Sequence, residues 1–137
     1  MYRAISIHPD QTKLQKILWK ESLRGPVKTY ELQTVTYGTV SAPFLAMRTL
    51  LQISQDEGDK FPLAASVLKN DFYMDDVLSG AESLSAALEL QEQLTGILKS
   101  AGMSLHKWCS NAPNLCKKKD NIYPFGDSKV SKALGVL

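Results

Sequence analysis

The pattern of hydrophobic and polar positions predicts extended structure in the first third of the chain. Residues 1–8 fit a strand, and we expect Pro9 to end it because proline has no amide hydrogen to donate to a sheet. Residues 11–20 predict a short helix that continues into a strand. Residues 27–38 are rich in β-branched and aromatic side chains and predict a further strand.

Two segments carry apolar residues at the three- and four-residue steps of a helix. The first covers residues 41–58, with Ser41 as the expected N-cap and Gly58 as the expected stop. The second covers residues 81–102, and Gly102 is its expected C-terminal stop. The apolar positions of this second helix are Ala87, Leu90, Leu94, Ile97 and Ala101.

The remaining segments predict mainly extended structure. Residues 66–80 favour extended structure, residues 103–111 and 132–137 favour single strands, and residues 111–128 favour a polar loop. Two helices and a mostly antiparallel set of strands are typical of an α+β fold, in which the helices pack on a sheet. We therefore expect a single α+β domain over residues 1–137.

Composition adds little to this picture, but it excludes several classes of protein. A chain of 137 residues with 44% hydrophobic and 22% charged side chains is ordinary for a globular domain with a real core. The net charge of +2 gives no sign of nucleic-acid binding, and the run Lys117–Lys119 is typical of a solvated loop. Two cysteines make no disulfide framework, and no apolar run approaches the roughly 18 residues of a membrane span. We expect an intracellular, cytoplasmic protein without a membrane partner.

The stretch KNDFYMDDVLSG, from Lys69 to Gly80, places two aspartates side by side among apolar residues. Successive residues of a strand point to opposite faces, so either Asp75 or Asp76 would face the core, where an ionised carboxylate is costly. A turn at the pair would expose both carboxylates and remove that cost. Met-Asp is a poor turn sequence, and such breaches of local preference concentrate at functional sites.

Two adjacent carboxylates repel each other unless a cation neutralises them. All-oxygen ligands suit Mg²⁺, which usually takes one or two protein carboxylates together with substrate phosphates. Paired ions of this kind stabilise the attacking and leaving oxygens of a phosphoryl transfer. The residues alone leave two interpretations open: an exposed Asp-Asp turn without a ligand, and a magnesium site on a hairpin.

Three stretches extend this observation: YELQTVTYGTVSAPFLAMRTL, DEGDKFPLAASVLKNDFYMDDVLSGA and AGMSLHKWCSN. In this order they closely resemble the polymerase palm of BEL/Pao-type LTR retrotransposon polyproteins, and YMDD resembles the catalytic box of reverse transcriptases. The resemblance runs over essentially the whole chain and implies a partial reverse transcriptase domain over residues 1–137. The implied fold is a palm-like (ferredoxin-like) antiparallel sheet with two helices packed on one face, truncated at both ends.

The same resemblance implies an activity and its cofactor. The activity is RNA-directed DNA polymerisation by two-metal nucleotidyl transfer in the intact polyprotein, with Asp75 and Asp76 as catalytic residues and as ligands of Mg²⁺ or Mn²⁺. The implied partners are an RNA or DNA template with primer, deoxynucleoside triphosphates, and the thumb, RNase H and integrase regions of the polyprotein. A virus-like particle is then the alternative to a free cytoplasmic location.

Five further residues match nucleotide- or primer-binding positions of that family. Tyr2 matches the aromatic residue that lies under the sugar and excludes a 2′-hydroxyl. Gly38 matches the glycine before the helix that supports the template and the incoming nucleotide, and Tyr37 stands where many retroviral relatives have glutamine. Met74 matches a position beside the primer end, and Lys107 matches a lysine near the triphosphate.

The family pattern also has a third carboxylate, which we expect four residues before Met1 and therefore outside this chain. The resemblance thus implies that the 137 residues alone are inactive. Two alternatives stay open, an inactive transposon-derived remnant and a small ferredoxin-like nucleic-acid-binding module. The module predicts exposed aromatic residues on its sheet for base stacking, whereas acids at the centre of that sheet would repel phosphates.

Overall fold

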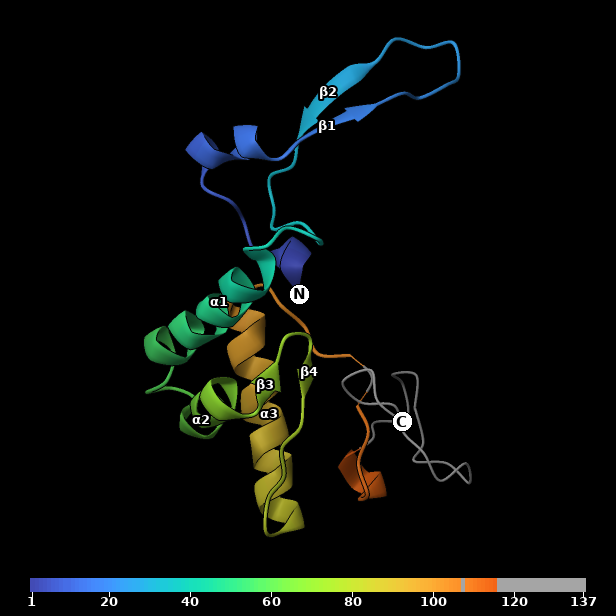
Figure 1. Cartoon of the computed structure of the whole chain (residues 1–137). Coiled ribbons are helices and arrows are strands. Elements are labelled where there is room, and N and C mark those ends of the chain that lie inside the picture. The colour runs from blue at the N-terminus through green and yellow to red at the C-terminus, as the bar shows by residue number, and fades with distance from the viewer. Residues whose placement is uncertain (107, 116–137) are drawn as a thin grey trace. The chain divides into compact units, whose positions relative to one another are not determined.

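The computed structural model describes residues 1–106 and 108–115 of the chain, which divides into two compact units, Met1–Thr49 and Leu50–Leu137. The described residues have a mixed α+β architecture of three main helices and two small two-stranded antiparallel sheets (Figure 1). Helix α1 (Ala42–Asp56) begins in the first unit and ends in the second. Within this part of the chain, no helix is both long enough and apolar enough to cross a membrane.

The first unit begins with a 3₁₀ turn, η1 (Tyr2–Ala4), where the sequence predicts a strand over residues 1–8. The Ile5 amide donates to the Tyr2 carbonyl oxygen at 3.0 Å and closes this turn. Extended backbone follows around Ser6, which forms an isolated antiparallel bridge with Thr34. The predicted strand is therefore wrong in its first half, because the turn directs the Tyr2 ring into a small core. That core consists of Tyr2, Val35, Ala42 and Ala46.

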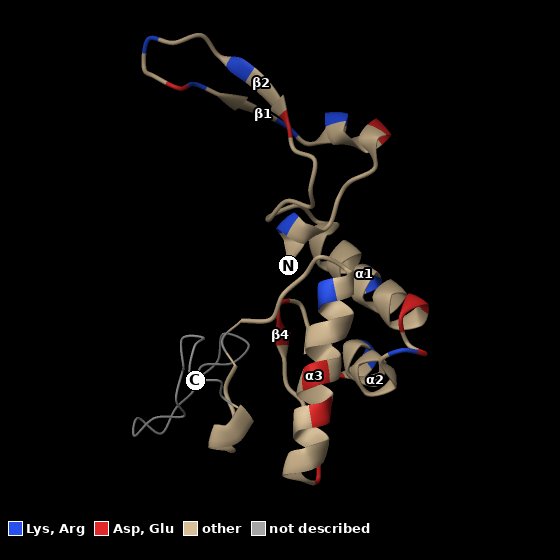
Figure 2. Ribbon diagram, turned by 180° about the vertical axis from the view of Figure 1, so that it is seen from behind, with Lys and Arg blue, Asp and Glu red and all other residues tan. Residues whose placement is uncertain are grey.

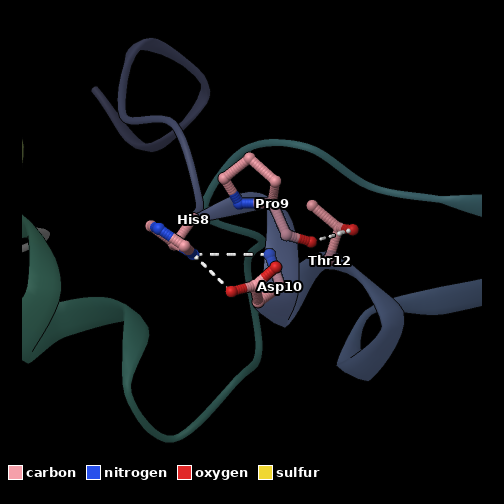
Figure 3. Close-up of polar contacts among 4 residues, drawn as sticks. All are labelled: His8, Pro9, Asp10 and Thr12. Atoms are coloured by element: carbon pink, nitrogen blue, oxygen red, sulfur yellow. Dashed lines mark hydrogen bonds and ion pairs between the residues drawn. The ribbon is translucent and has the colours of Figure 1, made fainter.

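A second 3₁₀ segment, η2 (Pro9–Leu14), confirms the short helical segment predicted at the start of residues 11–20. Its N-cap is His8, whose Nδ1 accepts a hydrogen bond from the Asp10 amide at 3.3 Å (Figure 3). The Thr12 hydroxyl donates to the Pro9 carbonyl oxygen at 2.9 Å within the same segment. Pro9 begins η2 because its fixed φ suits the first turn of a helix and its missing N–H is not needed there.

Strands β1 (Lys16–Trp19) and β2 (Lys28–Glu31) pair in an antiparallel hairpin, and residues 20–27 join them. Strand β2 lies within the strand predicted for residues 27–38, but it is much shorter. All of the residues in both strands are exposed. Among the described residues no third strand joins this sheet, so both of its edges are open.

Helix α1 confirms the helix predicted over residues 41–58. The Leu45 amide donates to the Ser41 carbonyl oxygen at 2.9 Å, which agrees with Ser41 as the first capping position. Gly58 follows the last turn of α1, where a Cβ atom would lie 2.5 Å from the Ser54 carbonyl oxygen, so the close backbone approach there requires glycine. The buried stripe of the helix consists of Ala42, Ala46, Leu50, Ile53 and Ser54.

Helix α2 (Pro62–Asn70) corrects the sequence analysis, which assigns residues 66–70 to extended structure. Together with Phe72 and Tyr73, the apolar pair Val67–Leu68 gives a local pattern that is typical of extended structure. Pro62 favours a helix instead, because proline is well suited to the first helical position and because Ala64 and Ala65, which have high helix propensity, follow it closely. The buried face of α2 consists of Ala64, Ala65, Val67 and Leu68, and this helix packs against α3.

Helix α3 (Leu84–Ser100) confirms the second predicted helix, and both of its ends are capped. The Ser83 hydroxyl accepts a hydrogen bond from the Ala86 amide at 3.2 Å. At the other end Gly102 has φ +71°. Its amide donates to the Lys99 carbonyl oxygen at 3.0 Å and the Met103 amide donates to the Leu98 carbonyl oxygen at 2.8 Å, which is the Schellman pattern. The buried residues of α3 are Gln91, Leu94, Ile97 and Leu98.

The described residues show no ferredoxin-like sheet, which corrects the predicted fold class. The strand predicted over residues 103–111 is absent from the described part of that segment. One physical reason lies in the buried Gln91, whose Nε2 donates to the Leu115 carbonyl oxygen at 2.8 Å and holds the short η3 (Pro113–Leu115) on α3. The predicted strand 132–137 and most of the predicted loop 111–128 lie outside the described residues.

The N-terminus of α2 receives its cap from the neighbouring helix. Gln93 on α3 places its Oε1 atom 2.9 Å from the Leu63 amide and 3.4 Å from the Ala64 amide. Both amides belong to the first turn of α2, where backbone donors have no partner within the helix. Gln93 therefore joins the two helices through a hydrogen-bond acceptor as well as through packing.

Replacing Gln93 by alanine should lower the free energy of unfolding by about 1–2 kcal/mol, the usual cost of losing a helix cap. Urea titration followed by circular dichroism measures this change. Gln55→Ala, at an exposed position on α1, is the matched control and should change it by less than about 0.5 kcal/mol. Equal stability of the Gln93 variant and the control would contradict a capping role.

Candidate functional site

The aspartate pair lies on a hairpin with a two-residue turn. Strand β3 (Phe72–Tyr73) pairs antiparallel with β4 (Asp76–Val77), with Phe72 opposite Val77 and Tyr73 opposite Asp76. Met74 and Asp75 are thus the two residues of the turn. This confirms that the chain turns at the acidic pair, as the cost of burying a carboxylate predicts.

The turn is made with a residue that is poorly suited to it. Met74 has φ +53°, in the left-handed region that two-residue hairpin turns require and that glycine or asparagine normally occupies. It is the one residue other than glycine with a positive φ in the described part of the chain. The surrounding structure must offset this local cost, of order 1–2 kcal/mol.

Two features at the base of the hairpin supply that support. The Phe72 side chain is 9% exposed, and β3 lies against α2. The backbone continues the pairing through the Leu78 amide, which donates to the Asp71 carbonyl oxygen at 3.2 Å, and the Ser79 hydroxyl donates to the Asp71 carboxylate at 2.6 Å. Asp71 and Ser79 are not among the predicted site residues, and their position as polar residues just outside the two strands is the signal that could have identified them.

The register of the hairpin explains how both carboxylates reach solvent. Tyr73 and Asp76 are directly opposite each other, so their side chains share one face, and both are exposed. Phe72 and Val77 share the opposite face and are buried and half-buried. Asp75 is exposed at the turn itself. Neither carboxylate therefore bears the desolvation cost of a buried charge.

The pair offers carboxylate oxygens, which are hard ligands of the type that Mg²⁺ and Mn²⁺ prefer. Within the described residues, no group of three or more histidine, cysteine, aspartate or glutamate side chains comes together in a way that could hold a metal ion. The hairpin by itself thus supplies two carboxylates. Two is the number that Mg²⁺ commonly takes from a protein when substrate phosphates complete its shell.

Three of the predicted nucleotide-binding residues lie in the first unit. The rings of Tyr2 and Tyr37 meet edge to face, with centroids 4.8 Å apart and an interplanar angle of 83°. Tyr2 is 7% exposed and Tyr37 is 60% exposed, so Tyr37 is the ring of this pair that a ligand could reach. Gly38 follows with φ +83° and open space where a side chain would lie. A backbone of this kind allows close approach of a ligand.

The predicted site residues therefore form two local groups. Tyr2, Tyr37 and Gly38 are brought together in the first unit, and Met74, Asp75 and Asp76 are brought together in the second. Lys107 lies outside the described residues.

Comparison of the chain with family models, with curated proteins and with solved structures gives no significant match. Any functional assignment therefore rests on the residues themselves and on the geometry of the described parts.

Replacing Ser79 by alanine should loosen the base of the hairpin, because it removes the hydrogen bond to the Asp71 carboxylate. A hydrogen bond of this kind contributes about 1 kcal/mol, so the Leu78 amide should exchange with solvent about fivefold faster. Hydrogen exchange followed by NMR measures this rate. Ser66→Ala on the exposed face of α2 is the control, and an unchanged Leu78 rate in the Ser79 variant would show that the hydrogen bond does not hold the hairpin.

Proposed function

We propose that this chain is the palm part of a reverse transcriptase of the BEL/Pao type, in which Asp75 and Asp76 hold catalytic Mg²⁺ during templated DNA synthesis. The observation that carries the proposal is the two-residue turn at YMDD, which exposes both carboxylates on a strained hairpin. An arbitrary Asp-Asp pair could be exposed by a glycine or asparagine turn without local cost. A methionine held at positive φ is the kind of conformation that concentrates at functional sites.

Two further observations support the proposal. The resembling stretches occur in the order of the family and run over essentially the whole chain. The hairpin also stands on a helical layer in its own unit, where β3 lies against α2 and α2 packs on α3. An acidic hairpin supported by helices is consistent with the palm arrangement that the resemblance implies.

The roles of this chain's own residues follow from their positions. Asp75 and Asp76 provide negative charge that is already exposed, so binding a cation removes their mutual repulsion without moving them out of a core. Bound Mg²⁺ would supply Lewis-acid activation of the primer hydroxyl and stabilisation of charge on the pyrophosphate. Tyr73 is 62% exposed and lies opposite Asp76, so its ring is on the same face of the hairpin as the Asp76 carboxylate. Met74 is the first residue of the turn, and its position next to Asp75 fits a residue beside the primer end.

Mn²⁺ added to the chain should bind at the hairpin with a dissociation constant of roughly millimolar, because two carboxylates without phosphates make a weak site. The paramagnetic ion should broaden the NMR amide signals of residues 73–77 before others. Asp75→Asn and Asp76→Asn should each remove this selective broadening.

Asp59→Asn is the matched control, because Asp59 is an exposed aspartate in the loop between α1 and α2. It should leave the broadening at the hairpin unchanged. Uniform broadening of all exposed acidic positions would mean that the pair has no preference for the ion.

In a polymerase that contains this palm together with fingers and thumb, Asp75→Asn should reduce primer extension by at least about 100-fold, since a metal ion contributes several kcal/mol of charge stabilisation. The fold should be retained, as measured by circular dichroism, because the side chain is exposed. Primer extension with a labelled primer, Mg²⁺ and deoxynucleoside triphosphates gives the rate, with Asp59→Asn as the control. A near-normal rate in the Asp75 variant would remove this residue from the catalytic site.

A further inference from the structure

The β1–β2 hairpin carries an exposed aromatic face that the proposed function does not use. Ile17 is opposite Tyr30 and Trp19 is opposite Lys28, so these four side chains share one face of the sheet. Trp19 is 58% exposed and Tyr30 is 40% exposed. The two rings are diagonal neighbours across the strands, at a typical spacing of roughly 7–8 Å.

The hairpin is also a concentration of positive charge. Residues 16–31 hold four basic and two acidic side chains, a net charge of +2 that equals the net charge of all 137 residues. Figure 2 shows the basic positions along β1, β2 and the loop that joins them. A phosphate chain is the natural counterpart of such a surface, and a like-charged surface is not.

Both acidic residues of the hairpin are already engaged. Glu31 forms an ion pair with Lys16 at 3.3 Å, and a hydrogen bond from Thr12 together with Lys16 lowers the pKa of its carboxyl. Glu21 forms an ion pair with Lys28 at 2.7 Å. Because each glutamate offsets one lysine, the remaining basic residues of this segment, Lys20 and Arg24, are its excess positive charge.

We propose that the β1–β2 hairpin is a contact surface for single-stranded nucleic acid, in which Trp19 and Tyr30 stack on bases while Lys20 and Arg24 contact phosphates. Exposed aromatic rings on a segment that also carries excess cations are the combination that holds a single strand without reading its sequence. A second copy of the chain would instead bring two positive surfaces together. The proposal does not rest on the proposed catalytic role of Asp75 and Asp76, which lie on the other sheet.

The test uses the whole chain and a fluorescein-labelled oligothymidylate at low salt, with fluorescence anisotropy as the readout. Trp19→Ala and Tyr30→Ala should each weaken binding by about 5- to 100-fold, the usual effect of losing one stacking ring. Trp19→Phe keeps an aromatic ring and should stay within about threefold of the unchanged chain. In a Trp108→Phe background, the oligonucleotide should also quench the emission of Trp19.

Leu18→Ala is the matched control for the aromatic face. Leu18 is 72% exposed and lies next to Trp19 on the same strand, but its side chain is on the opposite face. Its replacement should leave oligonucleotide binding unchanged. Asp59→Asn, at an exposed aspartate outside both hairpins, should also leave binding unchanged. The basic run Lys117–Lys119 is present in every variant, so differences between variants report the hairpin alone.

The contribution of charge has its own variant. Replacing both Lys20 and Arg24 by glutamine should weaken binding and should lower the slope of log affinity against log salt by about 1–2, because each phosphate contact releases counterions. An unchanged salt slope would refute the assigned phosphate contacts.

Three results would overturn the assignment of the aromatic face. The first is the absence of saturable binding at low salt, and the second is an equal loss for Leu18→Ala and Trp19→Ala. The third is a dimer, seen by sedimentation velocity, that Trp19→Ala dissociates while no oligonucleotide binds. That last result would assign the face to a second copy of the chain.

Discussion

The structure of the second unit depends on the cost of burying charge. Two aspartates in succession cannot continue a half-buried strand, because one of them would enter the core as an unpaired carboxylate. The chain therefore turns at Met74–Asp75, and Phe72 faces inward while Asp75 and Asp76 face solvent. The turn places Met74 at φ +53°. The chain thus avoids the cost of burying a carboxylate and accepts a smaller backbone strain at Met74.

The helices of that unit make the strained turn possible. Phe72 is held at α2, and α2 is held on α3 by packing and by the Gln93 side chain, which caps its first amides. The Asp71–Ser79 hydrogen bond then closes the hairpin below the turn. The side chains of Phe72, Ser79 and Gln93 thus hold the hairpin in place, while Asp75 and Asp76 face solvent.

The first unit has a small core and an exposed hairpin. Its small core surrounds Tyr2 and Val35, and the β1–β2 hairpin leaves all of its strand residues exposed. A two-stranded hairpin has little stability of its own. Because Trp19 and Tyr30 are exposed, their rings contribute little to a hydrophobic core and are available to bind a partner. The acidic hairpin and the aromatic hairpin are separate sheets in the described residues. Acids at the centre of a single sheet would repel the phosphates of a nucleic acid. Because Asp75 and Asp76 belong to a different hairpin, this repulsion does not argue against nucleic-acid binding by the aromatic face.

The sequence by itself determined the elements whose signals are local. The steps of three and four between apolar residues placed α1 and α3, Gly102 marked the C-terminal end of α3, and the cost of burying Asp75 or Asp76 placed the turn. Only the tertiary structure decided the features that depend on distant contacts. Gln91 draws the chain near Leu115 onto α3 where a strand is predicted. The helix that Pro62 begins extends through Val67 and Leu68, an apolar pair that fits a strand locally, because α2 buries both residues and packs against α3. Local patterns report which face of a segment is apolar, but which segment covers that face is decided by the balance of all the contacts that compete for it.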